Sequence, residues 1–204
     1  MPRFQIADDR RAAASQISVV TIACPIDTAR LTLRPWQADD APELAPILEA
    51  NVAHLGPWIP PAISTPAPVD KLRERLSGFA REFAADVKWR FAIVARDDES
   101  LLGEVDLFPR NASGRVSYPD ADRAEIGYWL RADRTGEGLA LEAAAAMVHV
   151  ASRLSAFSQL EIRCDAANAP SAAIPAKLGF ELMETIPDGD AMLQVWVKPI
   201  AGRR

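Results

Sequence analysis

The chain has little cysteine, no excess of positive charge and no long apolar run among its 204 residues. Its cysteines, Cys24 and Cys164, are too few for a disulfide framework and have no companion metal ligands. We therefore expect both to be small core or near-core residues in a reducing cytoplasm, and we expect no metal site. No segment approaches the roughly 20 apolar residues needed to cross a bilayer. We therefore expect no membrane partner.

The charge balance excludes further classes. A net charge of −5 argues against a nucleic-acid partner, because a phosphate backbone requires a basic face. The same charge is compatible with a cationic substrate such as a protonated amine. Acidic residues near the amino end, Asp8 and Asp9, argue against a secretory signal peptide, so we expect a cytoplasmic protein.

Two nucleotide-binding motifs are also missing. The glycine turn at residues 134–140 lacks the Gly-Lys-Ser/Thr of a P-loop and the third glycine of the dinucleotide fingerprint. The chain shows no βαβ repeats either, which argues against a nucleotide-dependent oxidoreductase.

What the chain does have is a strand, a glycine turn and a helix in succession. Residues 124–130 are typical of a strand, and after Ala140 the apolar residues recur at helical spacing as far as Leu154. Unpaired N–H groups and the helix dipole at such a start make a site for a phosphate. Gly136 and Gly138 place no Cβ between a ligand and those amides.

The remaining pattern predicts one domain of alternating elements. The proline-rich segment 51–68 and the polar segment 109–122 are predicted to be loops. The predicted strands are 31–36, 89–95, 101–108, 123–130, 160–165, 180–186 and 192–197, and the predicted helices are 40–50, 69–85, 140–154 and 168–178.

Several short motifs occur in the order of a known family. They are RLTLRPW at 30–36, HLGPW at 54–58, EIGYWL at 125–130, TGEGLA at 135–140, NAPS at 168–171 and KLGF at 177–180. Together they resemble the Gcn5-related N-acetyltransferase (GNAT) superfamily, and more closely its ribosomal-protein N-terminal acetyltransferase (RimJ/RimL-like) branch. The resemblance implies an α/β (α+β) fold with a mixed, mostly antiparallel sheet of about seven strands, splayed near its middle and flanked by about four helices. It also implies acetyl-CoA as cofactor and acetyl transfer to a primary amine. The resemblance covers residues 29–199, which we expect to form the domain, with residues 1–28 as an N-terminal extension and 200–204 as a tail.

The resemblance assigns the residues that would hold acetyl-CoA. The N–H of Leu130 would bind the thioester carbonyl, and Asn168 would contact the cofactor arm. The residues expected around the pyrophosphate are Arg134, Thr135, Gly136, Gly138, Leu139 and Ala140. Two of the turn's residues depart from the family, which usually has Arg or Gln at Thr135 and often a basic residue at Glu137. We expect weaker cofactor binding from these departures, with Arg134 able to supply charge.

Three carboxylates are candidates for the acid–base chemistry that an amine acceptor needs. Strand alternation puts Glu125 on one face with Gly127, and puts Glu104 and Asp106 on one face of the preceding strand. If the two strands pair, all three carboxylates converge on one cleft. By resemblance Glu125 is the general base; the alternative is that Glu125 and Glu104 only pair with Arg123 or solvent.

The leaving sulfur needs an acid, and the helix that often carries a tyrosine for this purpose has none here. Ser171 stands where the ribosomal-protein branch has a serine acid. Ser171 and Asn168 are also good helix-start residues, and the two roles are compatible.

The substrate side is less specific. His54 and Trp58 either line a substrate pocket, together with Glu104 and Asp106, or pack on the core edge. The acceptor is a protein N-terminus, a polyamine, an amino acid or a drug amine, and a homodimer is possible. The alternative function is a non-catalytic acyl-CoA-binding module, which Thr135, Glu137 and the missing tyrosine favour.

Overall fold

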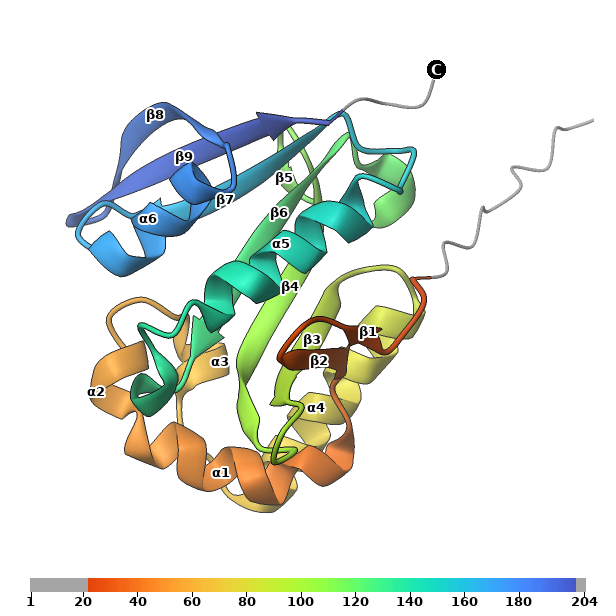
Figure 1. The fold of residues 1–204 in the computed structure, drawn as a ribbon, viewed down its shortest axis with the longest axis vertical. Helices are drawn as coiled ribbons and strands as arrows, with labels where there is room; N and C mark the ends of the chain where they lie inside the picture. The colour runs from red at the N-terminus through yellow and green to blue at the C-terminus, as the bar shows by residue number, and fades with distance from the viewer. Residues whose placement is uncertain (1–21, 201–204) are drawn as a thin grey trace, which may run out of the picture.

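The computed structural model describes residues 22–200, which form a twisted sheet with helices on both faces (Figure 1). The order of paired strands is β1-β2-β3-β4-β6-β7-β9-β8, with β5 added to β4. The strands are β1 Ile26–Asp27, β2 Leu31–Pro35, β3 Trp89–Ala95, β4 Leu101–Asn111, β5 Gly114–Arg115, β6 Arg123–Leu130, β7 Gln159–Asp165, β8 Glu181–Asp188 and β9 Ala191–Pro199. The helices are α1 Ala41–Ala50, α2 Val52–Leu55, α3 Pro61–Ser64, α4 Val69–Ala84, α5 Leu139–Ala151 and α6 Ala169–Lys177.

The seven long strands and four long helices are those predicted, so the expected fold class is confirmed. The two-residue strands β1 and β5 are additions to the predicted sheet. Segment 51–68 was expected to be loop throughout, and this is wrong at α2 and α3. Pro61 stands in the first turn of α3, where a helix does not need its missing N–H. Segment 109–122 is likewise not all loop, because β4 extends to Asn111 and pairs with β5.

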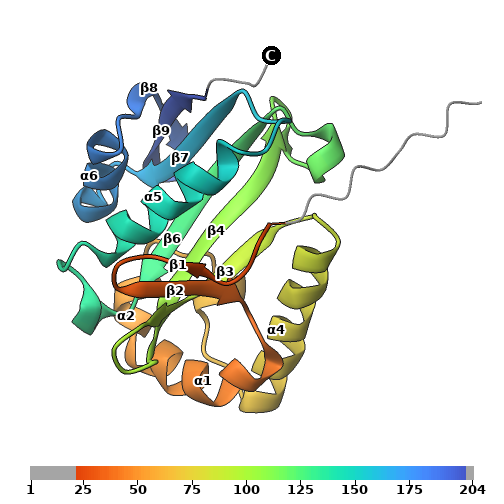
Figure 2. The ribbon, with the colours of Figure 1, turned by 45° about the vertical axis from the view of Figure 1, so that its right-hand side comes forward.

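Two apolar clusters hold the helices against the two faces of the sheet. One lies between the sheet and α5, where alternating residues of β3 and β4 meet Ala143 and Met147 of the helix. The other joins α1 and α4 to the opposite face through Trp36, Ala92 and Trp129. Figure 2 shows α5 running along β6 and β4, with α4 beyond β3. Each helix therefore buries one stripe against the sheet, as their apolar spacing requires.

Among residues 22–200 the sheet has one parallel pair, β6 and β7, and it is splayed between these two strands. β6 and β7 pair from Arg123–Gln159 to Ile126–Ile162, and the pairing stops there. Beyond that point β6 pairs only with β4, and β7 only with β9 (Figure 1). The gap opens on the side of the sheet where α5 and α6 begin, which places two helix starts beside it.

The cysteines differ from the expectation in one respect. Cys164 on β7 is buried, as predicted, but Cys24 is exposed, so the prediction that both lie in or near the core is wrong for Cys24. Residues 1–21 of the predicted extension 1–28 lie outside the described part of the chain. In its remaining part, β1 pairs with β2 at the sheet edge.

Gly103 is required for the close approach of β4 to β6. A Cβ at this position would lie 2.1 Å from the Trp129 carbonyl oxygen and 2.9 Å from the Leu130 Cα. We expect Gly103→Ala to lower the free energy of unfolding by about 2–3 kcal/mol, because backbone rather than a flexible side chain must move. Urea unfolding would measure it, with Gly78→Ala on α4 as the control. A Cβ at Gly78 meets only the end of Arg81, at 3.9 Å, so that change should stabilise the helix. Equal stability of Gly103→Ala and the wild type would contradict the prediction.

Candidate active site

A cleft of about 170 Å³ lies where β6 and β7 separate. It passes through the splay, so residues from both faces of the sheet line it. Glu104 and Asp106 of β4 and Glu125 of β6 lie on one side, and Ser171 of α6 on the other. The strand register places Asp106 opposite Gly127, and Phe108 opposite Glu125. The three predicted carboxylates therefore do line one cleft.

The backbone of Leu130 faces the splay. The N–H of Arg131 donates to the Leu102 carbonyl on β4, at 2.9 Å. In an antiparallel pair successive residues turn their peptide groups to alternate edges, so the groups of Leu130 point away from β4, toward the gap. Its carbonyl meets His54 Nε2 there at 3.2 Å. The Leu130 N–H thus stands where an elongated ligand would run between the strands.

The turn before α5 has the geometry of an anion cradle. Gly136 and Gly138 both have φ of 80°, in the left-handed region, and Gly138 is the N-cap of α5. A Cβ on Gly136 would meet no described atom within 4 Å, so the turn is open. The first amides of the helix, at Leu139 and Ala140, follow directly. These residues fit a diphosphate, the group that coenzyme A would present.

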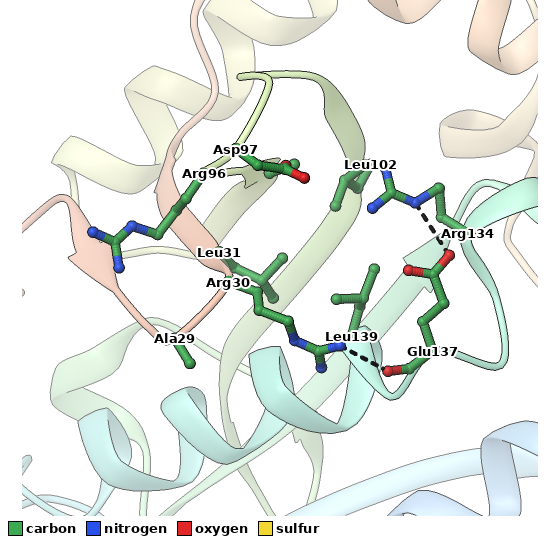
Figure 3. Close-up of a pocket in the computed structure, with 10 residues that line it drawn as sticks. Ala29, Arg30, Leu31, Arg96, Asp97, Leu102, Arg134, Glu137 and Leu139 are labelled. Carbon is green, nitrogen blue, oxygen red and sulfur yellow. Dashed lines mark hydrogen bonds and ion pairs between the residues drawn. The ribbon is translucent and has the colours of Figure 1, made fainter.

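Glu137, the acidic departure in this turn, is paired with a cation. Its carboxylate lies 3.2 Å from Arg134 Nε, and its carbonyl accepts a hydrogen bond from Arg30 at 3.0 Å (Figure 3). Arg30 is itself fixed by Glu142 on α5, at 2.7 Å. A hollow of about 370 Å³ lies beside these groups. The Glu137 charge is therefore compensated within the turn, and Thr135 bonds the Ala132 carbonyl at 2.8 Å.

Glu142 on α5 binds the segment that precedes β2, at Thr28 and Arg30. It accepts hydrogen bonds from the Thr28 hydroxyl at 2.6 Å and from the Arg30 N–H at 2.8 Å. Partial burial raises its pKa, but these bonds and the Arg30 guanidinium outweigh burial, and the net pKa is lowered. The carboxylate is therefore ionised at neutral pH and holds Arg30 against the turn.

Ser171 lies beside a tyrosine that the sequence reasoning missed. Asn168 caps α6 by accepting from the Ser171 N–H at 3.2 Å. The Tyr128 hydroxyl donates to the Ser171 carbonyl at 3.0 Å, and the Ser171 hydroxyl donates to the Tyr128 oxygen at 3.3 Å. Burial raises the pKa of Tyr128, which keeps the phenol protonated. Alternation put Tyr128 on the face away from the carboxylates, and only the splay lets it reach the cleft.

The cleft carboxylates have unequal partners. Glu104 accepts from the Trp36 indole at 2.6 Å and from Arg90 at 2.8 Å. Glu125 is held by two guanidinium groups, Arg110 at 2.5 Å and Arg115 in a still shorter contact. Arg123, the partner considered from the sequence, pairs instead with Glu161 and Asp122.

Segment 51–68 contributes residues other than His54 and Trp58 to the lining of the cleft. Ile59, Pro60 and Ile63 line the cleft, whereas Trp58 is 40% exposed and lies outside its lining. His54 contacts Leu130 and not the carboxylates.

Asn51 is a second residue that the sequence reasoning missed. It is 5% exposed, and its side chain joins α1 to the turn before α5. Its amide donates to the Ile47 carbonyl at 2.7 Å and its oxygen accepts from the Ala132 N–H at 2.7 Å. A lone asparagine after a helix carries no sequence signal for such a long-range contact.

Asn51→Ala should lower the free energy of unfolding by about 1–3 kcal/mol, because it removes both hydrogen bonds of a buried side chain. It should also weaken acetyl-CoA binding, since the turn loses its anchor to α1. Chemical unfolding and calorimetric titration with acetyl-CoA would measure the two effects. Asn51→Asp keeps the acceptor for Ala132 and should bind acetyl-CoA better than Asn51→Ala; the reverse order would contradict this role.

The described residues contain no group of three or more His, Cys, Asp or Glu side chains placed to hold a metal ion. Within residues 22–200 no helix combines the length and the apolar character needed to cross a membrane.

Comparison with known proteins agrees with this geometry. Residues 30–181 match the family model described as an acetyltransferase (GNAT) domain. The chain is 28% identical over 150 residues to the Bacillus subtilis protein named "Putative ribosomal N-acetyltransferase YdaF", covering 74% of this chain and 77% of that protein.

Solved structures share the fold, among them two acetyltransferases. One is RimL, the ribosomal L7/L12 α-N-protein acetyltransferase, in complex with coenzyme A, with a TM-score of 0.74 at 16% identity, covering 86% of this chain and 97% of that one. The other is the Salmonella typhimurium acetyltransferase described as modifying the N-terminal serine of L7/L12, with a TM-score of 0.68 at 17% identity and 85% and 97% coverage. The chain therefore belongs to the GNAT acetyltransferases, enzymes that transfer an acetyl group from acetyl-CoA to an amine.

Proposed function

We propose that this enzyme acetylates the α-amino group of a protein N-terminus in the cytoplasm. The observation that carries the proposal is that two hollows adjoin at Arg163 on β7. Arg163 lines both the cleft and a second hollow of about 540 Å³, which β5 and β8 border. An N-terminal residue in the cleft would leave the following residues room along this second hollow, whereas a small free amine needs no such extension. The names of YdaF and RimL favour the same acceptor class.

Residues of the cleft and of the turn before α5 have separate roles in the proposed acyl transfer. Bound acetyl-CoA supplies the activated acetyl thioester. We assign the amides of Gly136, Gly138, Leu139 and Ala140, with Arg134 and Thr135, to the pyrophosphate. The Leu130 N–H donates to the carbonyl oxygen as negative charge develops there. Asn168 contacts the cofactor arm.

The leaving sulfur receives its proton from Ser171. Its hydroxyl stands in a hydrogen-bonded pair with Tyr128, whose raised pKa keeps a proton available to restore it. The resemblance implies Glu125 as the general base, but both of its oxygens already bind arginines. Accepting a proton there would weaken its two arginine ion pairs.

A non-catalytic module is the weaker alternative. The acidic residue of the turn is compensated by Arg134, and Tyr128 supplies the phenol that α6 lacks. A homodimer stays a prediction, to be checked by sedimentation.

Release of free thiol from acetyl-CoA tests the proposed acceptor. The amines are hexapeptides beginning with serine, alanine or methionine, compared with spermidine and free amino acids. We expect kcat/KM at least about tenfold higher for one of the peptides, because binding energy beyond the amine favours the longer acceptor. The serine peptide with a blocked α-amine and a free lysine side chain is the control and should be inert. Preference for spermidine or an amino acid would overturn the N-terminal acceptor, and the absence of any turnover would overturn acetyl transfer by this chain.

A further inference from the structure

We propose that Asp106 takes the proton of the acceptor amine. The inference rests on the proposed function and deepens it, because it names the group that converts the protonated amine into a nucleophile. An amine is charged at neutral pH and cannot attack a carbonyl carbon until it loses a proton. The group that removes the proton must line the cleft and have an oxygen available to the amine.

Asp106 is the cleft carboxylate with an oxygen available. Both oxygens of Glu104 are engaged, by Trp36 and Arg90. Both oxygens of Glu125 are engaged by arginines. Asp106 is 5% exposed, and its Oδ1 has no hydrogen-bond partner among residues 22–200. A buried oxygen of this kind is costly unless a ligand or water completes it.

Gly127 leaves the Asp106 carboxyl uncovered by any side chain from the facing position on β6. It faces Asp106 across the β4–β6 pair, and a Cβ there would lie 3.3 Å from Asp106 Oδ2. Any side chain would therefore cover the carboxyl. Leu130 follows three residues later on β6, about 10 Å along the strand. An amine and one bridging water fill that span, so the nitrogen can lie between Asp106 and the carbonyl held by Leu130.

The charges around Asp106 suit a base. Burial raises its pKa, and so does neighbouring Glu104, while Arg90 and Arg115 act in the opposite direction; the net pKa is well above the ordinary value. Arg90 Nη1 is 3.6 Å from Oδ2. The charged groups that line the cleft are Arg90 on β3, Glu104 on β4, Arg115 on β5, Glu125 on β6, and Arg163 and Asp165 on β7. Arg75 on α4 lies outside the lining of the cleft and interacts electrostatically with Glu104.

The step balances in protons and electrons. Asp106 removes one proton from the ammonium group, and the freed lone pair forms the nitrogen–carbon bond of the amide. The carbon–sulfur bond breaks and its electron pair leaves on sulfur. The nitrogen gives up its second proton as the amide forms, and this proton replaces the one that sulfur gains through Ser171 and Tyr128. Asp106 then releases its proton to water.

Asp106→Asn tests the proposal by kcat/KM against pH, with the serine hexapeptide and acetyl-CoA. We expect a loss of about 100-fold or more at pH 7. The loss should shrink as the pH approaches the α-amine pKa of about 8, because more of the peptide is then already neutral. Asp188→Asn, at an exposed position on β8, is the matched control and should keep the wild-type rate. Glu125→Gln is measured in parallel.

Unfolding without acetyl-CoA gives an independent readout. A carboxyl whose folded pKa is raised stabilises the fold while protonated, and this contribution is lost as pH rises through that pKa. Asp106→Asn never ionises, so its Tm should match the wild type in acid and exceed it by at least about 2 °C at pH 8. If Asp106 had only a structural role, Asp106→Asn would not combine a higher Tm at pH 8 with a lower kcat/KM.

The outcomes are distinct. A wild type that releases no thiol with any amine overturns the proposed function and the role of Asp106 with it. An active wild type, with Asp106→Asn of equal rate and unchanged pH profile, overturns the role of Asp106 alone. So does a pH-dependent loss confined to Glu125→Gln.

Discussion

Arg90→Met is expected to lower the free energy of unfolding by about 3–5 kcal/mol, the usual cost of leaving a buried charge without its partner. Arg90 is 8% exposed and lies between the rings of Phe79 and Phe108, at 4.6 and 5.0 Å from their centroids. Its guanidinium compensates Glu104 at 2.8 Å and Asp106 at 3.6 Å. Methionine fills similar volume but leaves both carboxylates together in a dry site.

Urea unfolding at neutral pH measures this loss. The double variant Arg90→Met/Glu104→Gln should recover part of the stability, because one of the two buried charges is then absent. Arg73→Met is the control, since Arg73 pairs with an Asp39 side chain that is 90% exposed, and such pairs contribute about 1 kcal/mol at most. If Arg90→Met and Arg73→Met unfold at the same urea concentration, the buried pair does not have the assigned weight.

Gly138→Val is expected to weaken acetyl-CoA binding by about tenfold or more. Gly138 has φ of 80° and ψ of 9° at the N-cap of α5, a conformation that a β-branched residue adopts only with strain. The turn must change its backbone, and its amides then lose their common direction. Hydrogen bonds to a charged group contribute about 1.5–3 kcal/mol each, so losing one already corresponds to about tenfold.

Calorimetric titration with acetyl-CoA measures the change, and Gly189→Val separates strain from binding. Gly189 has φ of 61° in the β8–β9 turn, so valine there carries a similar backbone cost away from α5. We expect Gly189→Val to lower Tm and keep the wild-type affinity. A Gly138→Val protein that binds acetyl-CoA as tightly as the wild type would contradict the cradle at this turn.

Much of the fold follows from local pattern. β6 and α4 appear within a residue of their predicted bounds, because each has a clear period and a defined end. The single-turn helices α2 and α3 were missed because four residues are too few to show a helical period. Prolines, which marked their segment as loop, are also compatible with a first helical turn.

The sequence predicts where the candidate site lies, but not the hydrogen-bond and ion-pair partners of its residues. Alternation placed Glu125 on one face of its strand and Glu104 and Asp106 on one face of theirs, and the register of β4 and β6 brings all three into one cleft. Arg90 and Arg110 decide which carboxylates have an ion-pair partner. Arg90 lies on another strand and Arg110 near a strand end, so no local sequence spacing predicts these pairs. Tyr128 reaches Ser171 only because β6 and β7 separate, a property of the assembled sheet.

Fragmentation mass spectrometry of the serine hexapeptide after incubation with acetyl-CoA and the enzyme tests the central claim most directly. The account predicts one acetyl group, located on the α-nitrogen and formed together with one free thiol. It also predicts that Asp106→Asn yields almost no such product at pH 7. An acetyl group on a side chain, or an unmodified peptide with active wild-type enzyme on small amines, would contradict it.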